Sequence, residues 1–174
     1  QWGNIGLTNI NFKNCRNLTG IIPKSDLAEL PGCEYCFNGT GITGLEEGFC
    51  FSGGTNWRFL FAGCSKLTSI PDSFKIVDGV IQINNMFQSC TSLETLPENF
   101  SIPFGIKAAA SMFHKCTSLK ELPDTCILPN DLSGGLTYFF AECTNLKTLP
   151  DGFTIPDGVT SLAYMFRSCG IESL

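Results

Sequence analysis

The sequence predicts an α/β solenoid in which one structural turn of about 26 residues recurs along the chain. A Phe-x-x-Cys step recurs at spacings of 26, 26, 27 and 26 residues. Its phenylalanines are Phe61, Phe87, Phe113, Phe140 and Phe166. Prolines fall in two further columns, one at Pro71, Pro97, Pro123 and Pro150 and the other at Pro103, Pro129 and Pro156. Proline fixes φ and lacks an N–H group, so these columns mark the corners of each turn.

Each turn contains patterns that suit short elements. The Ser-Leu-x-x-Leu stretch, as at 92–96, and the Phe-x-Ile stretch, as at 100–102, favour short parallel strands. The next segment, as at 80–87, has apolar residues at i, i+3 and i+6, which favours a strand end leading into a helical turn. We expect a single domain over residues 1–174, with irregular repeats in 1–59 and regular repeats in 60–174.

The chain has ten cysteines, six of which fall in one repeat column. Equivalent residues of adjacent turns lie ~4.8 Å apart and point the same way, a geometry that rarely permits disulfides. The sequence therefore predicts a buried ladder of free thiols at Cys15, Cys64, Cys90, Cys116, Cys143 and Cys169. Cys33, Cys36 and Cys126 occupy apolar columns and are expected in the core, whereas Cys50 occupies a polar column and is expected to be exposed. Cys33 and Cys36 match C-x-x-C without a second ligand pair, and the disulfide status of Cys33, Cys36 and Cys50 stays open.

Composition excludes several classes of function. Hydrophobic residues make up 43% of the chain and charged residues 16%, which fits a continuous core. A net charge of −5 argues against nucleic-acid binding, no apolar run is long enough to span a membrane, and the first residues lack a signal-peptide pattern. No phosphate loop or dinucleotide motif is present, and the single histidine, His114, lies in a variable column expected to be exposed. We predict no cofactor and no enzymatic activity.

An aromatic column lies two residues before the repeating phenylalanine. Its members are Tyr35, Phe59, Tyr138 and Tyr164, and Asn85 and Ser111 interrupt it. Because the column tolerates polar residues, we expect it to be partly exposed and suited to stacking on sugars or anchoring a protein partner. The alternative is that the rings simply pack along the outside of the coil.

An acidic column follows the first proline column. Asp72, Glu98, Asp124 and Asp151 would lie ~5 Å apart if the turns stack, and a divalent cation or a basic partner could relieve their repulsion. The alternative is ordinary Pro-Asp turn chemistry. The sequence assigns no metal site.

The recurring Leu-x-x-Leu-Pro-Asp-x-Phe-x-Ile-Pro and Met-Phe-x-x-Cys-x-Ser-Leu patterns resemble the BspA-like leucine-rich-repeat surface proteins. The resemblance covers residues 60–174 well and 1–59 loosely, and this chain has a slightly longer period and proline-rich corners. It implies a leucine-rich-repeat solenoid on a bacterial cell surface or secreted, without catalytic residues, as part of a longer surface protein. We therefore expect a binding or adhesion module that presents repeated columns to a host or matrix protein or a glycan. The alternative function is a structural spacer or stalk segment.

Overall fold

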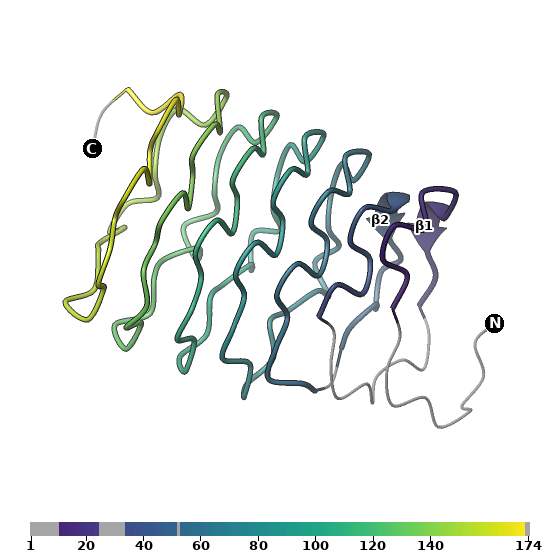
Figure 1. Cartoon of the computed structure of the whole chain (residues 1–174), viewed down its shortest axis with the longest axis horizontal. Coiled ribbons are helices and arrows are strands. Elements are labelled where there is room, and N and C mark those ends of the chain that lie inside the picture. The colour runs from purple at the N-terminus through teal and green to yellow at the C-terminus, as the bar shows by residue number, and fades with distance from the viewer. Residues whose placement is uncertain (1–10, 25–33, 52, 173–174) are drawn as a thin grey trace.

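In the computed structural model, residues 11–24, 34–51 and 53–172 are described. The chain winds through successive turns that stack side by side along the longest dimension of the molecule (Figure 1). Strand β1 spans Thr19–Ile22 and strand β2 spans Gly41–Leu45, and the two pair in parallel. Isolated parallel bridges join Asn56 to Gln82 and Gln82 to Ala108 in the following turns.

The strands predicted for every turn form only as β1 and β2 among the described residues. Later Leu-x-x-Leu segments are joined more sparsely, as where the Glu94 N–H donates to the Thr68 carbonyl at 3.2 Å. The predicted Phe-x-Ile strand follows a tight turn, closed at 2.9 Å by the Phe100 N–H donating to the Pro97 carbonyl. Such turns at the proline corners interrupt the backbone before a ladder can extend.

The predicted helical turn is not confirmed, because the described residues contain no helix. Its place is taken by a run of tight turns in which alternate N–H groups bond in different directions. The Met86 N–H donates within its own turn to the Ile83 carbonyl at 3.2 Å, whereas the Phe87 N–H donates to Met112 of the next turn at 2.9 Å. A helix would use all of these donors internally, so stacking against the next turn replaces helix formation.

A left-handed backbone recurs at two positions of this segment in successive turns and explains why the helix cannot form. Positive φ angles cost energy for residues with a side chain and cannot continue a right-handed helix. The first position has φ between 56° and 59° at Tyr35, Phe59, Asn85, Ser111, Tyr138 and Tyr164. The second, four residues later, is Gly39, Gly63, Ser89, Lys115, Glu142 or Ser168.

This backbone predicts that Ser89→Val destabilises the protein. Ser89 has φ 59°, where a β-branched side chain is strongly disfavoured. We expect the free energy of unfolding to fall by ~1–3 kcal/mol, measured by urea denaturation. Ser92→Val is the matched control, since Ser92 is also half-buried but is not among the positive-φ residues. Equal losses in the two variants would contradict the backbone explanation.

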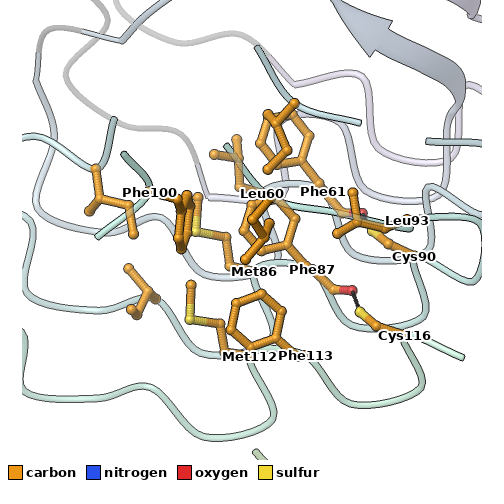
Figure 2. Close-up of a cluster of buried hydrophobic side chains, with 14 of the residues drawn as sticks. Leu60, Phe61, Met86, Phe87, Cys90, Leu93, Phe100, Met112, Phe113 and Cys116 are labelled. Atoms are coloured by element: carbon orange, nitrogen blue, oxygen red, sulfur yellow. Dashed lines mark hydrogen bonds between the residues drawn. The ribbon is translucent and has the colours of Figure 1, made fainter. Parts of the chain in front are cut away.

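The core is a stack of phenylalanine rings, as the repeat columns predict. Phe87 lies between Phe61 and Phe113, with ring centroids at 5.6 and 5.8 Å and rings nearly parallel, as Figure 2 shows. All three side chains are fully buried, and Met86 and Met112 fill the adjacent space. Phe100, from the Phe-x-Ile stretch, meets Phe87 edge-on at 6.1 Å. The apolar columns thus form one continuous core through the stack.

The cysteine column forms the predicted ladder over four turns. In Figure 2 the Cys116 thiol donates to the Phe87 carbonyl of the preceding turn, with Sγ 3.1 Å from the oxygen. That carbonyl also accepts the Cys90 N–H at 3.1 Å. Equivalent thiol bonds to the preceding turn at 3.0–3.1 Å are made by Cys64, Cys90 and Cys143. The thiols therefore tie neighbouring turns together.

Other cysteine predictions meet mixed outcomes. Cys15 is exposed and Cys169 half-buried, so the predicted six-member buried ladder is too long, because the described residues cover these two from one side only. Cys36 and Cys126 are buried and Cys50 is exposed, as predicted. Cys33 lies outside the described residues. Every cysteine that the structure describes is a free thiol.

Candidate functional site

The aromatic column is held in register by the backbone. The Tyr35 N–H donates to the Arg58 carbonyl of the next turn, and the Tyr138 N–H donates to the Ala163 carbonyl, each at 3.0 Å. Each column residue has the left-handed φ described above. Successive side chains therefore leave the backbone at equivalent points of neighbouring turns.

The four aromatic residues form two separate stacks. In the first stack, the Tyr35 and Phe59 ring centroids are 4.7 Å apart with an interplanar angle of 6°. In the second stack, the Tyr138 and Tyr164 centroids are 4.9 Å apart at 16°. Asn85 and Ser111 occupy the column between the stacks. Tyr164 is 59% exposed, and the other three rings are half-buried.

Cationic side chains accompany both stacks. The Lys13 ammonium lies 3.9 Å from the Tyr35 ring centroid, and the Arg58 guanidinium carbon lies 5.6 Å from that of Phe59. The Arg167 guanidinium carbon lies 5.9 Å from the centroid of Tyr164. These distances fall within the range of cation–π attraction. Each stack therefore presents aromatic edges together with positive charge.

His114 is half-buried, so its predicted exposure is wrong. Its side chain is 15% exposed, because its ring packs beside Tyr138 with centroids 5.4 Å apart. Its Nδ1 lies 3.3 Å from Gln88 Nε2, and its Nε2 lies 3.5 Å from Glu142 Oε1. The histidine thereby braces the inner end of the Tyr138–Tyr164 stack.

The acidic column lies on exposed corners. Asp72, Glu98, Asp124 and Asp151 are all exposed, each directly after a proline whose carbonyl accepts an N–H from three residues later at 2.8–3.0 Å. This is the turn geometry given above as the alternative. The described residues contain no group of three or more side chains suited to holding a metal ion.

The buried thiols offer little reactivity. Burial raises the pKa of Cys64 to about 11 and that of Cys143 to about 12, so both stay protonated at neutral pH. A protonated thiol is a hydrogen-bond donor and a poor nucleophile. These cysteines therefore have a structural role, in which their thiols hydrogen-bond neighbouring turns to each other.

Comparison with known protein families shows which family the chain belongs to. The family model for the BspA type leucine rich repeat region matches residues 5–97 and 58–174, in six copies. The chain belongs to this family. The BspA-type repeat indicates a protein-interaction module, and its family is generally non-enzymatic. Among the residues that the structure describes, no helix is long and apolar enough to cross a membrane.

Comparisons with solved structures and with curated proteins add little to this family assignment. The crystal structure of a leucine rich repeat protein from T. pallidum is 20% identical, and the match covers 82% of this chain and 78% of that one with a TM-score of 0.40. No curated protein matches the sequence.

The left-handed backbone of the aromatic column and the cations beside its rings were not predicted from the sequence of this BspA-type chain. The left-handed backbone of the aromatic column was missed, although Asn85 in that column and Gly39 and Gly63 four residues along it are typical of positive φ. The interruption of the column at Asn85 and Ser111 did indicate the division into two stacks. The cations beside the rings gave no regular repeat signal. Lys13 and Arg167 share the column directly after the repeating phenylalanine, but that column holds uncharged residues such as Ala62 and Gln88 in other turns, and Arg58 belongs to another column.

Proposed function

We propose that this chain is a non-enzymatic binding module of a cell-surface or secreted protein, and that it binds a host or matrix protein through Tyr138 and Tyr164. The observation that carries the proposal is the exposed stack of these two tyrosines beside Arg167. Tyrosine and arginine are enriched among residues that dominate protein interfaces. The BspA-type family is typically surface-associated, which supports the location.

The stack geometry favours a protein over a glycan. A sugar ring stacks on the flat face of an aromatic side chain, but Tyr138 and Tyr164 cover each other's inner faces at 4.9 Å. Tyr138 also lies beside His114, and the Arg167 guanidinium lies over the Tyr164 ring. The hydroxyl groups and the guanidinium suit hydrogen bonds with a protein surface. We therefore propose a protein ligand, and the binding test below includes glycans as the alternative.

A structural spacer is the second candidate. The continuous phenylalanine core and thiol ladder join each turn to the next, which suits a segment that holds other parts of a surface protein apart. Such a segment needs no ligand.

A binding survey with matched variants tests the proposal. Tyr138→Asn/Tyr164→Asn removes both rings while keeping residues that tolerate the left-handed backbone, as Asn85 does. Against immobilised matrix proteins and a glycan array, we expect the parent to bind a protein and this variant to lose about tenfold or more in affinity. Tyr35→Asn/Phe59→Asn, which deletes the other stack, should keep parental affinity.

The other outcomes have equally definite meanings. Loss confined to the Tyr35→Asn/Phe59→Asn variant would move the site to the first stack. Parental affinity in both variants would contradict an aromatic site. Binding to glycans alone would replace the protein ligand, and no binding to any surface would favour the spacer.

A further inference from the structure

A hollow surface lies along the proline corners, away from the residues of the aromatic column. One hollow of about 810 Å³ and another of about 340 Å³ share Glu121, Leu122 and Asp124 in their walls. The smaller extends to Glu98 of the preceding turn, and the larger extends to Asp151 of the following turn. Because they share these walls, the two hollows adjoin as one surface across three turns, which we call the acidic trough.

The trough combines apolar and negatively charged walls. The larger hollow is lined by Ile155, which is 37% exposed, and by Leu149 and Phe153, which are half-buried. The carboxylates that line the two hollows are all exposed, at Glu98, Glu121, Asp124 and Asp151. The trough thus offers an apolar surface with exposed negative charge beside it.

These four carboxylates lack counter-charges. Within the described residues, none of them forms an ion pair or accepts a hydrogen bond. Other acidic residues are paired differently: Glu94 faces Lys120, and Glu172 faces Lys147. The lysines nearest in sequence therefore bond outside the trough and leave its charge available to a partner.

The charge and shape select one class of partner. We propose that the acidic trough binds an extended segment of a partner protein in which lysine or arginine lies beside an apolar side chain. The cationic groups meet the carboxylates, and the apolar side chain packs against Ile155 and Phe153. With turns ~5 Å apart, three turns span roughly 10 Å, the length of about three extended residues.

A metal ion is the weaker occupant. The described residues hold no set of three ligands arranged for a metal ion, and the apolar wall would gain nothing from one. A peptide uses both the carboxylates and the apolar wall. Tyr138 and Tyr164 do not line the trough, so this proposal stands separately from the aromatic site.

The test measures binding of a fluorescein-labelled octapeptide of alternating lysine and leucine to the full chain by fluorescence anisotropy. Glu121→Gln/Asp124→Asn removes the two charges common to both hollows, and we expect about tenfold weaker binding or more. Asp78→Asn/Asp157→Asn is the matched control, because it removes two exposed carboxylates outside the trough. That control should weaken binding less than about twofold.

Two further comparisons separate the trough from general charge attraction and from the aromatic site. An octapeptide with serine in place of leucine should bind at least about tenfold more weakly, because it cannot use the apolar wall. The Tyr138→Asn/Tyr164→Asn variant should bind the lysine–leucine peptide as the parent does. Absence of parental binding, similar affinity in the trough and control variants, equal binding of the serine peptide, or loss in the tyrosine variant would each overturn the proposal.

Discussion

Replacing Phe113 with alanine is expected to lower the free energy of unfolding by ~3–5 kcal/mol. The Phe113 ring is fully buried and lies between Phe87 and Phe140, each with its centroid 5.8 Å away and nearly parallel. Phe100 and Phe139 meet it edge-on at 6.5 and 5.6 Å. Removing the ring leaves a cavity that breaks the aromatic stack between three consecutive turns.

Phe166→Ala is the matched comparison for this prediction. Phe166 occupies the same column but is half-buried, and its ring stacks on Phe140 with the centroids 6.0 Å apart. In a stack of repeats, stability comes largely from contacts between neighbouring turns, so a ring stacked on one side contributes less than a ring stacked on both sides. We expect the loss to be roughly half that of Phe113→Ala. Urea denaturation of both variants measures the difference, and similar losses would show that the rings contribute independently of their neighbours.

The repeat columns allowed the core to be predicted from sequence, because each aligned position has the same surroundings in every turn. Phe87 and Phe113 stack as the alignment requires, and the Cys116 thiol reaches the turn before it. Thr40, three residues after Phe37, occupies the cysteine column in an early turn, and this substitution has a physical basis. The Thr40 hydroxyl is buried and donates to the Phe37 carbonyl at 2.8 Å, so a hydroxyl replaces the thiol at this point of the column.

Secondary structure was harder to predict because apolar spacing reports which residues are buried and not how the backbone bonds. The spacing from Val80 to Phe87 is compatible with a helix, but alternate N–H groups of this segment bond to the next turn. Left-handed residues then permit the chain to reverse direction repeatedly, as at Asn85 and Ser89. A pattern of buried positions cannot distinguish this arrangement from a helix.

The candidate sites were predicted less completely for a different reason. Column membership correctly placed Tyr138 and Tyr164 on adjacent turns, where they stack. The partners of an exposed side chain, however, change from turn to turn within one column. Arg167 lies beside Tyr164, whereas the same column holds Ala62 and Gln88 in other turns. The negative charge available in the hollows beside Glu121 and Asp124 likewise depends on where the neighbouring lysines form ion pairs. The repeat alone does not determine this.

Raising the pH above about 9 is expected to destabilise the protein strongly through its buried thiols. Burial raises the pKa of Cys64 to about 11 and the pKa of Cys126 and Cys143 to about 12. Burial also raises the pKa of Cys90 and Cys116 well above the ordinary value of 9.0. These five thiols keep their protons in the folded protein over a pH range in which the unfolded chain releases them.

The sign of the effect follows from this difference in bound protons. Below pH 9 the thiols are protonated in both states, so their contribution to stability is fully present. Between about 9 and 11 the unfolded chain ionises first, and each thiol lowers the free energy of unfolding by about 1.4 kcal/mol per pH unit. Five thiols would therefore remove roughly 7 kcal/mol by pH 10. This is comparable with the entire stability of many domains.

Cys126→Val separates the contribution of one thiol to this pH dependence from the contributions of lysine and tyrosine side chains. Cys126 is fully buried among the core side chains, and valine has a similar volume without an ionisable group. Between pH 8 and pH 10, we expect urea denaturation to show a fall in the free energy of unfolding that is about 1.4 kcal/mol smaller in the variant than in the parent. Because both proteins share their other titrating groups, those contributions cancel in the comparison. An identical pH dependence in parent and variant would mean that the Cys126 thiol ionises in the folded protein as readily as in the unfolded chain, contrary to its position in the core.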